Sequence, residues 1–448
     1  MDIRISSTDM QIDHRTRRHM SRMLSPLTGL TRSVGFLAHG SGEGNLLTAG
    51  AELTGVHGLV GRPDPGPGAY HIGGGGLMLG EALVRCFGET VERYAHFVWQ
   101  PYGAHGLAHG THDELAARGE RALAPDELSF FTDDQLADPG LPYRRFSPSA
   151  PLGWLKLPSL TGGEPCWIPA HLLVVGYVRR TDELPLLSAV TTGTAAHTDP
   201  DQALVNALQE IVQIDAAMGH WYSQAQAPRI VLDERTAVVR AVVARYFRWA
   251  PEPRFHLLAS PDLPGFSVAC IVRSPAGMPA AGVGLGVGLR LQSAMYKALL
   301  EAMGAMQLAK KGLLDAAGEV GRLLDGSVPD RIYDLERNVL FYAVPENGKY
   351  LEAKFSDETT IAAGELPDDE VLAPRDEAAR LVAAFAAAGK DLYVMDLTPA
   401  DVAKLGFTVT RAWSPDTISL SLPSAPPLAH AGFARYGPAG QLLPHPYP

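Results

Sequence analysis

Three glycine-rich stretches of this chain each lead into a helix-like segment that carries the same pattern. An alanine is followed four residues later by a small residue, and three residues after that by glutamate. The copies are Ala82-Cys86-Glu89 after 73–76, Ala203-Ala207-Glu210 after Thr192-Gly193, and Ala294-Ala298-Glu301 after Gly284, Gly286 and Gly288. At about 3.6 residues per turn, the alanine and the small residue share one face. We therefore predict three helices that pack closely on a sheet, each with its glutamate about one turn further on.

The acidic residues of these helices favour a shared cation site. Two copies carry a second polar residue one turn later, Glu92 after Glu89 and Gln213 after Glu210. Burying a carboxylate is costly unless it is paired or bound to a metal, so several acids on core-facing helices suggest one common cation. The alternative is three ordinary amphipathic helices whose acids face solvent. That alternative explains any single copy, but the threefold recurrence with glycine leads favours the shared site.

Composition is that of a large globular protein. The chain has 448 residues, 46% hydrophobic and 19% charged, which argues against extensive disorder. Its net charge of -11 disfavours binding to nucleic-acid phosphates. No apolar run approaches the ~20 residues that span a membrane, and residues 1–22 are too charged for a signal peptide. Cys86, Cys166 and Cys270 are far apart among apolar neighbours, and we interpret them as core thiols of a cytoplasmic protein.

Helical and extended patterns alternate irregularly, which predicts a mixed α+β fold. Residues 172–178 and 186–191 are typical of strands. After residue 414 the periodicity fades and prolines accumulate. We predict an N-terminal segment of the body over 1–65, a core over 66–413 and a proline-rich tail over 414–448 that lies on the body.

The ordered motifs resemble those of the YcaO superfamily over most of the chain. The first family motif is similar to GGGG…EALVRCFGETVERYA, where Glu89, Glu92 and Arg93 match. The second is similar to TTGTAAH…ALVNALQEIVQIDA and the third to AMYKALLEAMG, with matches at Glu210, Gln213, Asp215 and Glu301. The resemblance implies a YcaO-type fold, in which glycine-led helices pack on β-sheets around a central nucleotide site.

The last five residues, Pro444-His445-Pro446-Tyr447-Pro448, make the resemblance more specific. A terminal Pro-x-Pro-x-Pro is similar to the signature of the azoline-forming cyclodehydratases of the superfamily. Prolines hold an extended backbone with little entropy to lose, so such a tail can place its terminal carboxylate inside a site. The resemblance implies that the Pro448 carboxylate reaches the active site and acts as a general base. Composition alone would favour the alternative, a disordered proline-rich end.

The resemblance also implies ATP- and Mg²⁺-dependent chemistry on a peptide amide. A Cys, Ser or Thr side chain of a ribosomal precursor peptide attacks the preceding carbonyl. ATP phosphorylates the resulting oxygen, and phosphate leaves as a thiazoline or oxazoline ring forms. Family glutamates bind the magnesium ions that bridge the triphosphate, a role that carries over to Glu89, Glu92, Glu210 and Glu301 and suits hard cations. Arg93 and Gln213 would orient nucleotide or metal ligands.

Four positions depart from the family pattern. Arg85 stands where the family has Ser, and Gly75 stands where it has Lys. Thr192 replaces the usual Asn, and Gly304 replaces the usual Gln. Arg85 could bind the triphosphate and replace the missing lysine charge, because guanidinium pairs well with phosphate. It could equally fill the nucleotide pocket and pair with Glu89, which would leave a degenerate scaffold that binds peptide or partner. We favour activity, since the metal glutamates are all present. A third alternative, a thioamide- or amidine-forming YcaO enzyme, is disfavoured by the proline-rich terminus.

The same resemblance indicates the partners. No segment is typical of a separate leader-peptide-binding domain, and family members of this length usually act with a ThiF-like protein that captures the leader of the precursor peptide. We therefore expect such a partner. A homodimer and an accompanying flavin-dependent azoline oxidase are compatible with this assignment, whereas nucleic acid and membrane are not expected as partners.

Three further patterns carry less weight. His105, His109 and His112 have spacings that could ligate zinc, but they lie in a glycine-rich loop with no fourth ligand in view, so we do not expect a metal there. The run GVGLGVG at 282–288 is similar to a dinucleotide fingerprint, but it lacks the acidic residue expected about 20 residues later. Lys310-Lys311 is expected at the solvated end of its helix.

Overall fold

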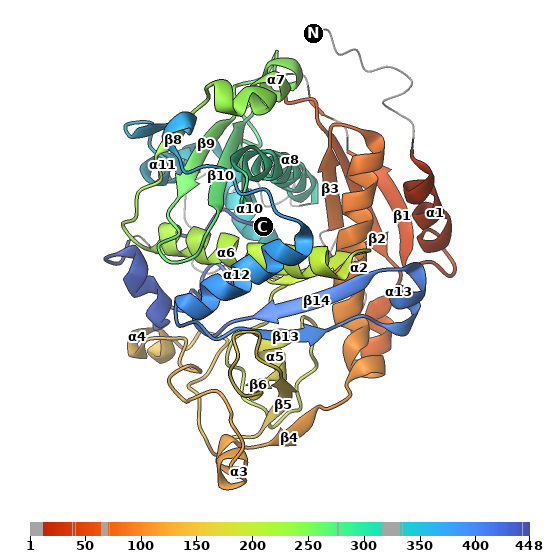
Figure 1. Ribbon diagram of the computed structural model, residues 1–448, viewed down its shortest axis with the longest axis vertical. Helices are drawn as coiled ribbons and strands as arrows, with labels where there is room; N and C mark the ends of the chain where they lie inside the picture. The colour runs from red at the N-terminus through yellow and green to blue at the C-terminus, as the bar shows by residue number, and fades with distance from the viewer. Residues whose placement is uncertain are drawn as a thin grey trace.

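The structure, a computed structural model, describes residues 12–37, 39–40, 42–63, 70, 72–275, 277–315, 332–333, 335–440 and 442–448. Within these residues, helices and strands alternate along the chain. The strands form four separate sheets, and three helices of more than 20 residues connect them (Figure 1). This arrangement confirms the predicted mixed fold class.

The largest sheet has five strands in the order β11-β10-β9-β8-β12. Strands β10 and β11 form a long antiparallel pair, and helix α8 lies on both of them. The β12 strand pairs in parallel with β8. The elements are β8 (Arg229–Val231), β9 (Arg254–Leu258), β10 (Phe266–Arg273), β11 (Ala281–Gly288), β12 (Thr360–Ala362) and α8 (Leu291–Asp315).

Two three-stranded sheets carry the other long helices. The sheet β1-β2-β3 packs against α2, and the sheet β13-β14-β7 packs against α6. Helix α12 lies against α6, and α1 contacts α2. Their bounds are α1 (His14–Met23), β1 (Thr31–Phe36), β2 (Leu47–Leu53), β3 (Ile72–Gly76), α2 (Leu79–Gly103), β7 (Thr194–His197), α6 (Pro200–Tyr222), α12 (Pro374–Ala387), β13 (Tyr393–Asp396), α13 (Ala400–Leu405) and β14 (Thr408–Trp413).

The fourth sheet, β4-β5-β6, forms the lower part of the molecule in Figure 1 with three short helices. These elements are β4 (Ala108–Gly110), α3 (His112–Ala117), α4 (Asp133–Ala137), β5 (Leu152–Leu157), β6 (Cys166–Pro169) and α5 (Ala170–Leu173). The remaining elements are η1 (Val56–Val60), η2 (Glu234–Thr236), α7 (Ala237–Tyr246), α10 (Leu335–Ala343), η3 (Pro345–Asn347), α11 (Gly348–Lys354), η4 (Ala363–Glu365) and η5 (Ala431–Tyr436).

Helix α6 runs across the middle of the molecule, with α2 to one side of it and α8 above it in Figure 1. It is buried along almost its whole length. The small side chains that face the sheets are fully enclosed, among them Ala82, Cys86, Ala294 and Ala298. The three helices predicted from the repeated pattern therefore exist, and the small-residue face of each packs as expected. All three cysteines are buried free thiols, as predicted.

The segments 172–178 and 186–191 were expected to be strands, and that expectation is wrong. Residues 170–173 form the short helix α5, and neither segment pairs with a neighbouring strand. Side chains bind the backbone of the first segment instead. Arg411 donates to the Leu172 carbonyl, His96 accepts from the Val175 N–H, and Gln100 bonds both polar groups of Val178. Because these bonds satisfy backbone groups that a neighbouring strand would otherwise bind, no partner strand is needed.

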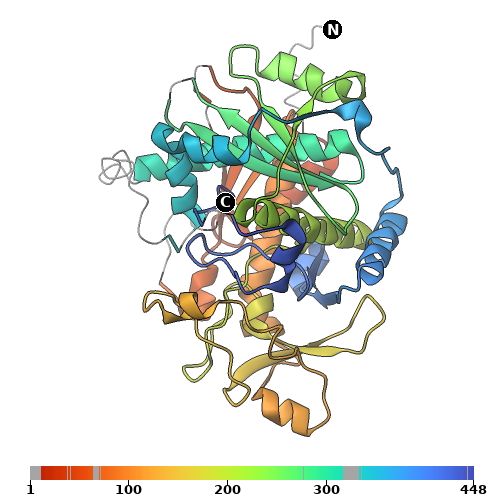
Figure 2. The same ribbon diagram turned by 90° about the vertical axis from the view of Figure 1, so that its left-hand side faces the viewer.

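The C-terminal tail packs against α6 and α10 rather than extending into solvent. His445 and Tyr447 are 0% and 2% exposed. Both views place the end of the chain in the interior of the fold, beside α6 and α10 (Figures 1 and 2). The disordered alternative for this end is therefore wrong for the described residues 442–448. The predicted division at residues 65 and 413 stays a prediction, and β1 and β2 share a sheet with β3 across the first boundary.

Candidate functional site

Glycines let each helix approach its strand at backbone distance. A Cβ atom on Gly284 would lie 2.0 Å from the Ala302 nitrogen, and one on Gly286 would lie 2.1 Å from the Ala294 carbonyl oxygen. On the first copy, a Cβ on Gly74 would lie 2.4 Å from the Ala82 oxygen. No side chain fits at such distances, so the glycine leads hold the acidic helices close against their strands.

Two glycine-to-alanine substitutions in β11 and α8 test this close contact, one at the contact and one away from it. Gly286→Ala is expected to lower the free energy of unfolding by about 2 kcal/mol or more, because the backbone must move to admit the methyl group. Gly304→Ala, within α8, meets nothing within 4 Å and should be neutral or stabilising by up to about 1 kcal/mol. Urea unfolding of both variants measures the difference. Equal stability of the two would contradict the close approach.

All three glutamates of the repeated pattern make the same hydrogen bond. Each accepts a backbone N–H from the glycine stretch that precedes its own helix. The donors are Gly73 to Glu89 at 2.9 Å, Gly193 to Glu210 at 3.0 Å and Leu285 to Glu301 at 2.5 Å. The backbone of the glycine stretches therefore fixes the three carboxylates, whereas the amphipathic alternative requires them to be bonded only to solvent.

Glu92 connects two of these units. It lies on α2 one turn after Glu89, and its carboxylate accepts the Ala196 N–H of β7 at 2.8 Å. The first acidic helix is thereby tied to the strand that leads into the second. Gln213 is half-buried on α6, one turn after Glu210.

The acids raise one another's pKa. Loss of hydration of the carboxylates within the surrounding protein is the main cause: it raises the pKa of Glu210 to about 7 and that of Glu301 to about 8, and it raises the pKa of Glu92 well above the ordinary value. Repulsion adds to burial, because Glu210 and Glu89 act on both Glu92 and Glu301. Glu301 is exposed and Glu92 half-buried, yet the surrounding protein and neighbouring carboxylates disfavour their charged forms. Such an arrangement favours bound cations.

Two arginines partly neutralise the cluster. Arg93 donates to Glu89 at 3.1 Å on the same helix. Arg411, on β14, is 1% exposed, bonds the Thr192 carbonyl and donates to the Thr194 hydroxyl at 3.2 Å. Burial lowers the pKa of Arg411 to about 10, and the opposing charge of Glu210 raises it. The motifs named Arg93, whereas nothing in the sequence around Arg411 distinguished it from a surface arginine of a strand.

Arg85 does not pair with Glu89. It pairs with Glu81 one turn earlier at 3.0 Å and lies over the Tyr296 ring at 5.9 Å. The Tyr296 hydroxyl donates to the same Glu81 carboxylate. Arg85 thus belongs to a network between α2 and α8, and the predicted pairing that would fill the site through Glu89 is wrong in this structure.

Lys297 is a cation that the sequence motifs did not indicate. It lies one turn before Glu301, the position that Arg85 holds relative to Glu89. Its ammonium donates to Gln209 at 2.9 Å and to the Val287 carbonyl at 3.3 Å. Burial, together with the neighbouring charge of Arg85, lowers its pKa to about 8. Two neighbouring cations on α2 and α8 are a suitable partner for phosphate oxygens.

The donor set fits magnesium that is bound together with phosphate. Among the described residues, no three His, Cys, Asp or Glu side chains are grouped closely enough to hold a metal ion by themselves. Magnesium typically uses one or two carboxylates, water and substrate phosphates rather than a cage of protein ligands. Carboxylates that are held in place by the backbone of the glycine stretches match that requirement.

Asp215 anchors the tail to the second acidic helix. Its carboxylate is 1% exposed and accepts from the Ile418 N–H at 2.7 Å, the Arg435 guanidinium at 3.0 Å and the Tyr436 hydroxyl at 2.7 Å. It lies five residues after Glu210 on α6. The motif match at Asp215 therefore corresponds to a contact with the tail.

The terminal residues are fixed by α6 and α10. Asn338 donates to the carbonyls of His445 and Tyr447 at 2.9 and 2.7 Å. Tyr342 donates to the Pro444 carbonyl at 2.6 Å, and the Trp221 indole donates to Leu443 at 2.9 Å. These bonds hold the backbone up to the residue before Pro448.

The remaining sequence candidates do not form a site. His109 contacts Glu183 at 3.3 Å, whereas His112 packs on Phe146, so the histidines do not converge on a metal. The run 282–288 lies in β11, and its glycines serve the approach of α8. Lys310 pairs with Glu43, which is 7% exposed, so the expectation of a solvated position is wrong for this lysine.

One family of known proteins matches most of the chain. A model of the YcaO cyclodehydratase family, described as ATP- and Mg²⁺-binding, matches residues 73–418. The chain belongs to the YcaO family. No curated protein matches the chain. Among the described residues, no helix is long and apolar enough to cross a membrane.

Solved structures of this family share the fold at low identity. A heterocyclase in complex with substrate and cofactor is 18% identical with a TM-score of 0.66, covering 90% of this chain and 52% of its own. The chain thus spans about half the length of that heterocyclase. YcaO from Methanopyrus kandleri, bound with AMPPCP and Mg²⁺, is 18% identical with a TM-score of 0.57, covering 86% of each chain. The E. coli microcin synthetase McbBCD complex with pro-MccB17 bound is 14% identical with a TM-score of 0.59, covering 95% of this chain and 98% of its own.

Proposed function

We propose that this YcaO protein is an ATP- and Mg²⁺-dependent cyclodehydratase, which converts Cys, Ser or Thr of a ribosomal precursor peptide to thiazoline or oxazoline. Ring formation joins the side-chain sulfur or oxygen to the preceding carbonyl carbon. Mg-ATP supplies the phosphoryl group that lets the amide oxygen leave as phosphate. The net change in the peptide is the loss of one water per ring.

One observation carries the proposal. Three glutamates at equivalent positions are held by equivalent backbone bonds from glycine stretches, and Glu92 joins two of the three units. Glu89, Glu92, Glu210 and Glu301 would hold magnesium, and Arg93 and Gln213 would orient nucleotide or metal ligands. The phosphates would contact Arg85 and Lys297. The ion pair with Glu81 places Arg85 on the side of α2 that faces α8.

The Pro448 carboxylate would act as the general base of ring formation. It comes after a backbone that Asn338 and Tyr342 fix, so the tail arrives at a defined end point inside the fold. Precursor recognition would need a ThiF-like partner. The structurally similar E. coli microcin synthetase McbBCD is a complex with pro-MccB17 bound, which supports a partner of this kind.

Mg-ATP is expected to raise the melting temperature of the protein through linkage. Glu89→Gln should abolish that rise and still fold, because the amide can accept the Gly73 N–H. Differential scanning fluorimetry with and without Mg-ATP measures both effects. A wild type that millimolar Mg-ATP does not stabilise, even with partner and peptide present, would favour the degenerate scaffold. Mass spectrometry of the peptide then separates ring formation, which loses water, from thioamide formation, which exchanges oxygen for sulfur.

Binding of Mg-ATP near pH 7 should release protons. Glu210 and Glu301 have pKa values raised to about 7 and about 8, so near pH 7 Glu301 is mostly protonated and Glu210 about half protonated, and a bound cation must displace these protons. Without ligand, the folded state keeps these protons while the unfolded state loses them, so stability should fall as pH rises towards 8. The stabilisation by Mg-ATP should grow over the same interval.

Above pH 8 the affinity should decline again, because Lys297 then loses its charge. Calorimetry in buffers of different ionisation enthalpy measures the protons released. Glu301→Gln should reduce their number at pH 7, whereas Glu234→Gln, on an exposed residue of η2, should not. A proton count that neither variant changes would contradict the assignment.

A further inference from the structure

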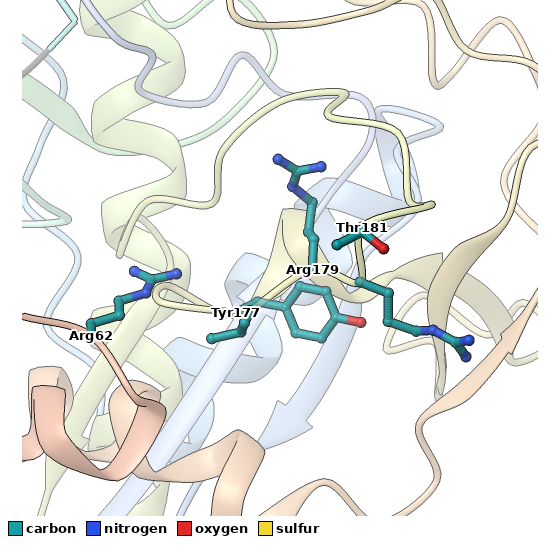
Figure 3. Close-up of a pocket in the computed structure, with 6 residues that line it drawn as sticks. Arg62, Tyr177, Arg179 and Thr181 are labelled. Atoms are coloured by element: carbon teal, nitrogen blue, oxygen red, sulfur yellow. The ribbon is translucent and has the colours of Figure 1, made fainter.

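A cationic pocket lies beside the far end of α2, outside the acidic site. It has a volume of about 350 Å³ and is lined by Arg62, Tyr177, Val178, Arg179, Arg180 and Thr181 (Figure 3). Three guanidinium groups in one pocket are unusual for a chain with a net charge of -11. The three arginines are exposed, whereas Tyr177 is buried.

The pocket floor is held rigidly to the helix that carries Glu89 and Glu92. Gln100 donates to the Val178 carbonyl at 3.0 Å and accepts its N–H at 2.6 Å. Tyr177 donates to the Glu183 carboxylate at 3.1 Å, and Arg179 donates to the Glu183 carbonyl at 2.8 Å. These bonds fix the backbone that presents the arginines, so the pocket is preorganised.

The carboxylates near the pocket do not neutralise all three arginines. Asp182 lies 3.6 Å from Arg180, and Glu183 is buried under the pocket and contacts Tyr177 and His109. Among the described residues, no carboxylate lies within ion-pair distance of Arg62 or Arg179. The Arg62 guanidinium, and the N–H groups of Arg179 that the Glu183 carbonyl does not take, remain available to a ligand.

The spacing of the arginines suits several carboxylates along a chain better than one compact anion. Figure 3 shows Arg62 and Arg179 reaching from different segments, with guanidinium groups that do not converge on one point. A phosphate needs donors that converge on its oxygens. An extended polypeptide instead presents separate side chains at steps of about 3.3 Å per residue.

The position of the pocket relates it to the acidic site. Three residues one turn apart, Glu92, His96 and Gln100, lie on one stripe of α2. Glu92 contacts Ala196 and Gln100 contacts Val178. Between them, His96 contacts both Thr194 and Val175. Gln100 lies eight residues after Glu92, which is about 12 Å along the helix. An extended peptide covers that distance in about four residues.

We propose that this pocket binds acidic side chains of the polypeptide substrate, at least about four residues from the residue that is cyclised. The proposal rests on the proposed function in taking that polypeptide as the substrate. Binding measured without ATP tests the pocket itself, whether or not ring formation is detected.

The binding experiment uses a fluorescein-labelled ten-residue peptide of alternating Glu and Gly at low salt, and the same peptide with Gln in place of Glu. The variant is Arg62→Gln with Arg180→Gln, because neither side chain makes a hydrogen bond to the backbone of the described residues. Fluorescence anisotropy should show binding of the Glu peptide only, weakened about tenfold in the variant and by added salt. The matched control, Arg240→Gln with Arg248→Gln, removes the same charge from other exposed positions and should bind as the wild type does.

Three results would overturn the proposal: equal weakening in the control variant, equal binding of the Gln peptide, or arginine-dependent binding of tripolyphosphate without binding of the Glu peptide. The activity arm compares Cys-containing peptides with Glu placed two or six residues from the Cys. The farther Glu should lower KM without changing kcat, and the variant should remove that advantage. An advantage that persists in the variant would show that the acidic residue binds elsewhere.

Discussion

Two residues added after Pro448 are expected to lower the rate of ring formation at least about 10²-fold, the usual contribution of a general base. Extended proline backbone rises about 3.1 Å per residue, so this extension moves the terminal carboxylate by about 6 Å. Proton transfer needs direct or water-mediated contact. Binding of Mg-ATP should change little, since the glutamates that would hold the metal lie on α2, α6 and α8.

The structure makes extension a cleaner test than removal. His445 and Tyr447 are buried, and Tyr447 packs against Trp221 with ring centroids 6.2 Å apart. Deleting 444–448 would remove these contacts and leave a cavity between α6 and α10, which lowers stability for reasons unrelated to catalysis. An extension keeps the buried rings in the chain and alters only the position of the terminal carboxylate.

The measurement is the initial rate of water loss from the peptide, monitored by mass spectrometry, alongside the Mg-ATP-induced rise in melting temperature. An extension before Met1 serves as the control and should leave both quantities unchanged. If the protein with the C-terminal extension cyclises its peptide at the rate of the unextended protein, the carboxylate is not the base and the tail serves only in packing.

The acidic site could be predicted from sequence because its elements are local. Ala294, Ala298 and Glu301 lie within two turns of one helix, and the glycines that admit the helix precede it directly. Spacing alone therefore predicts which residues face the strand and which one can reach back to its backbone. The same reasoning holds for the copies at Glu89 and Glu210.

Contacts between distant segments could not be predicted in this way. Arg411 lies 201 residues after Glu210 in the sequence. The two charges interact only because β14, which carries Arg411, pairs with β7. Residues 172–178 have the apolar composition of a strand, yet side chains of α2 and β14 take their backbone bonds. Periodicity reports which face is buried, but it does not report which group will satisfy the backbone.

Asp215 gives the second large effect. Asp215→Ala is expected to lower the free energy of unfolding by about 3–5 kcal/mol, because it breaks a buried pair and removes an acceptor from three donors at once. The tail should loosen as a result. Arg435 keeps Asp262 as a partner at 3.2 Å, so the loss falls on the connection to α6.

The loss of stability in Asp215→Ala is expected to leave nucleotide binding intact, although Asp215 and Glu210 lie on the same helix. Glu210 keeps its bond to the Gly193 N–H in the variant, because that bond involves neither Asp215 nor the tail. Asp215→Ala protein should therefore still gain stability from Mg-ATP, while ring formation falls as it does on extension after Pro448. Hydrogen exchange of residues 416–440 should speed up selectively.

A double-mutant cycle with Arg435→Met tests whether the pair itself transmits the effect. Coupling of about 1 kcal/mol or more between Asp215 and Arg435 is expected for a contact this buried. Asp262→Asn is the comparison variant, because it removes the other carboxylate of Arg435 without touching α6. It also removes the partner of Lys390 at 2.8 Å, so its coupling to Asp215, rather than its own loss of stability, is compared. Ring formation that survives Asp215→Ala at the wild-type rate, in protein that is still folded, would show that anchoring the tail to α6 does not set the position of Pro448.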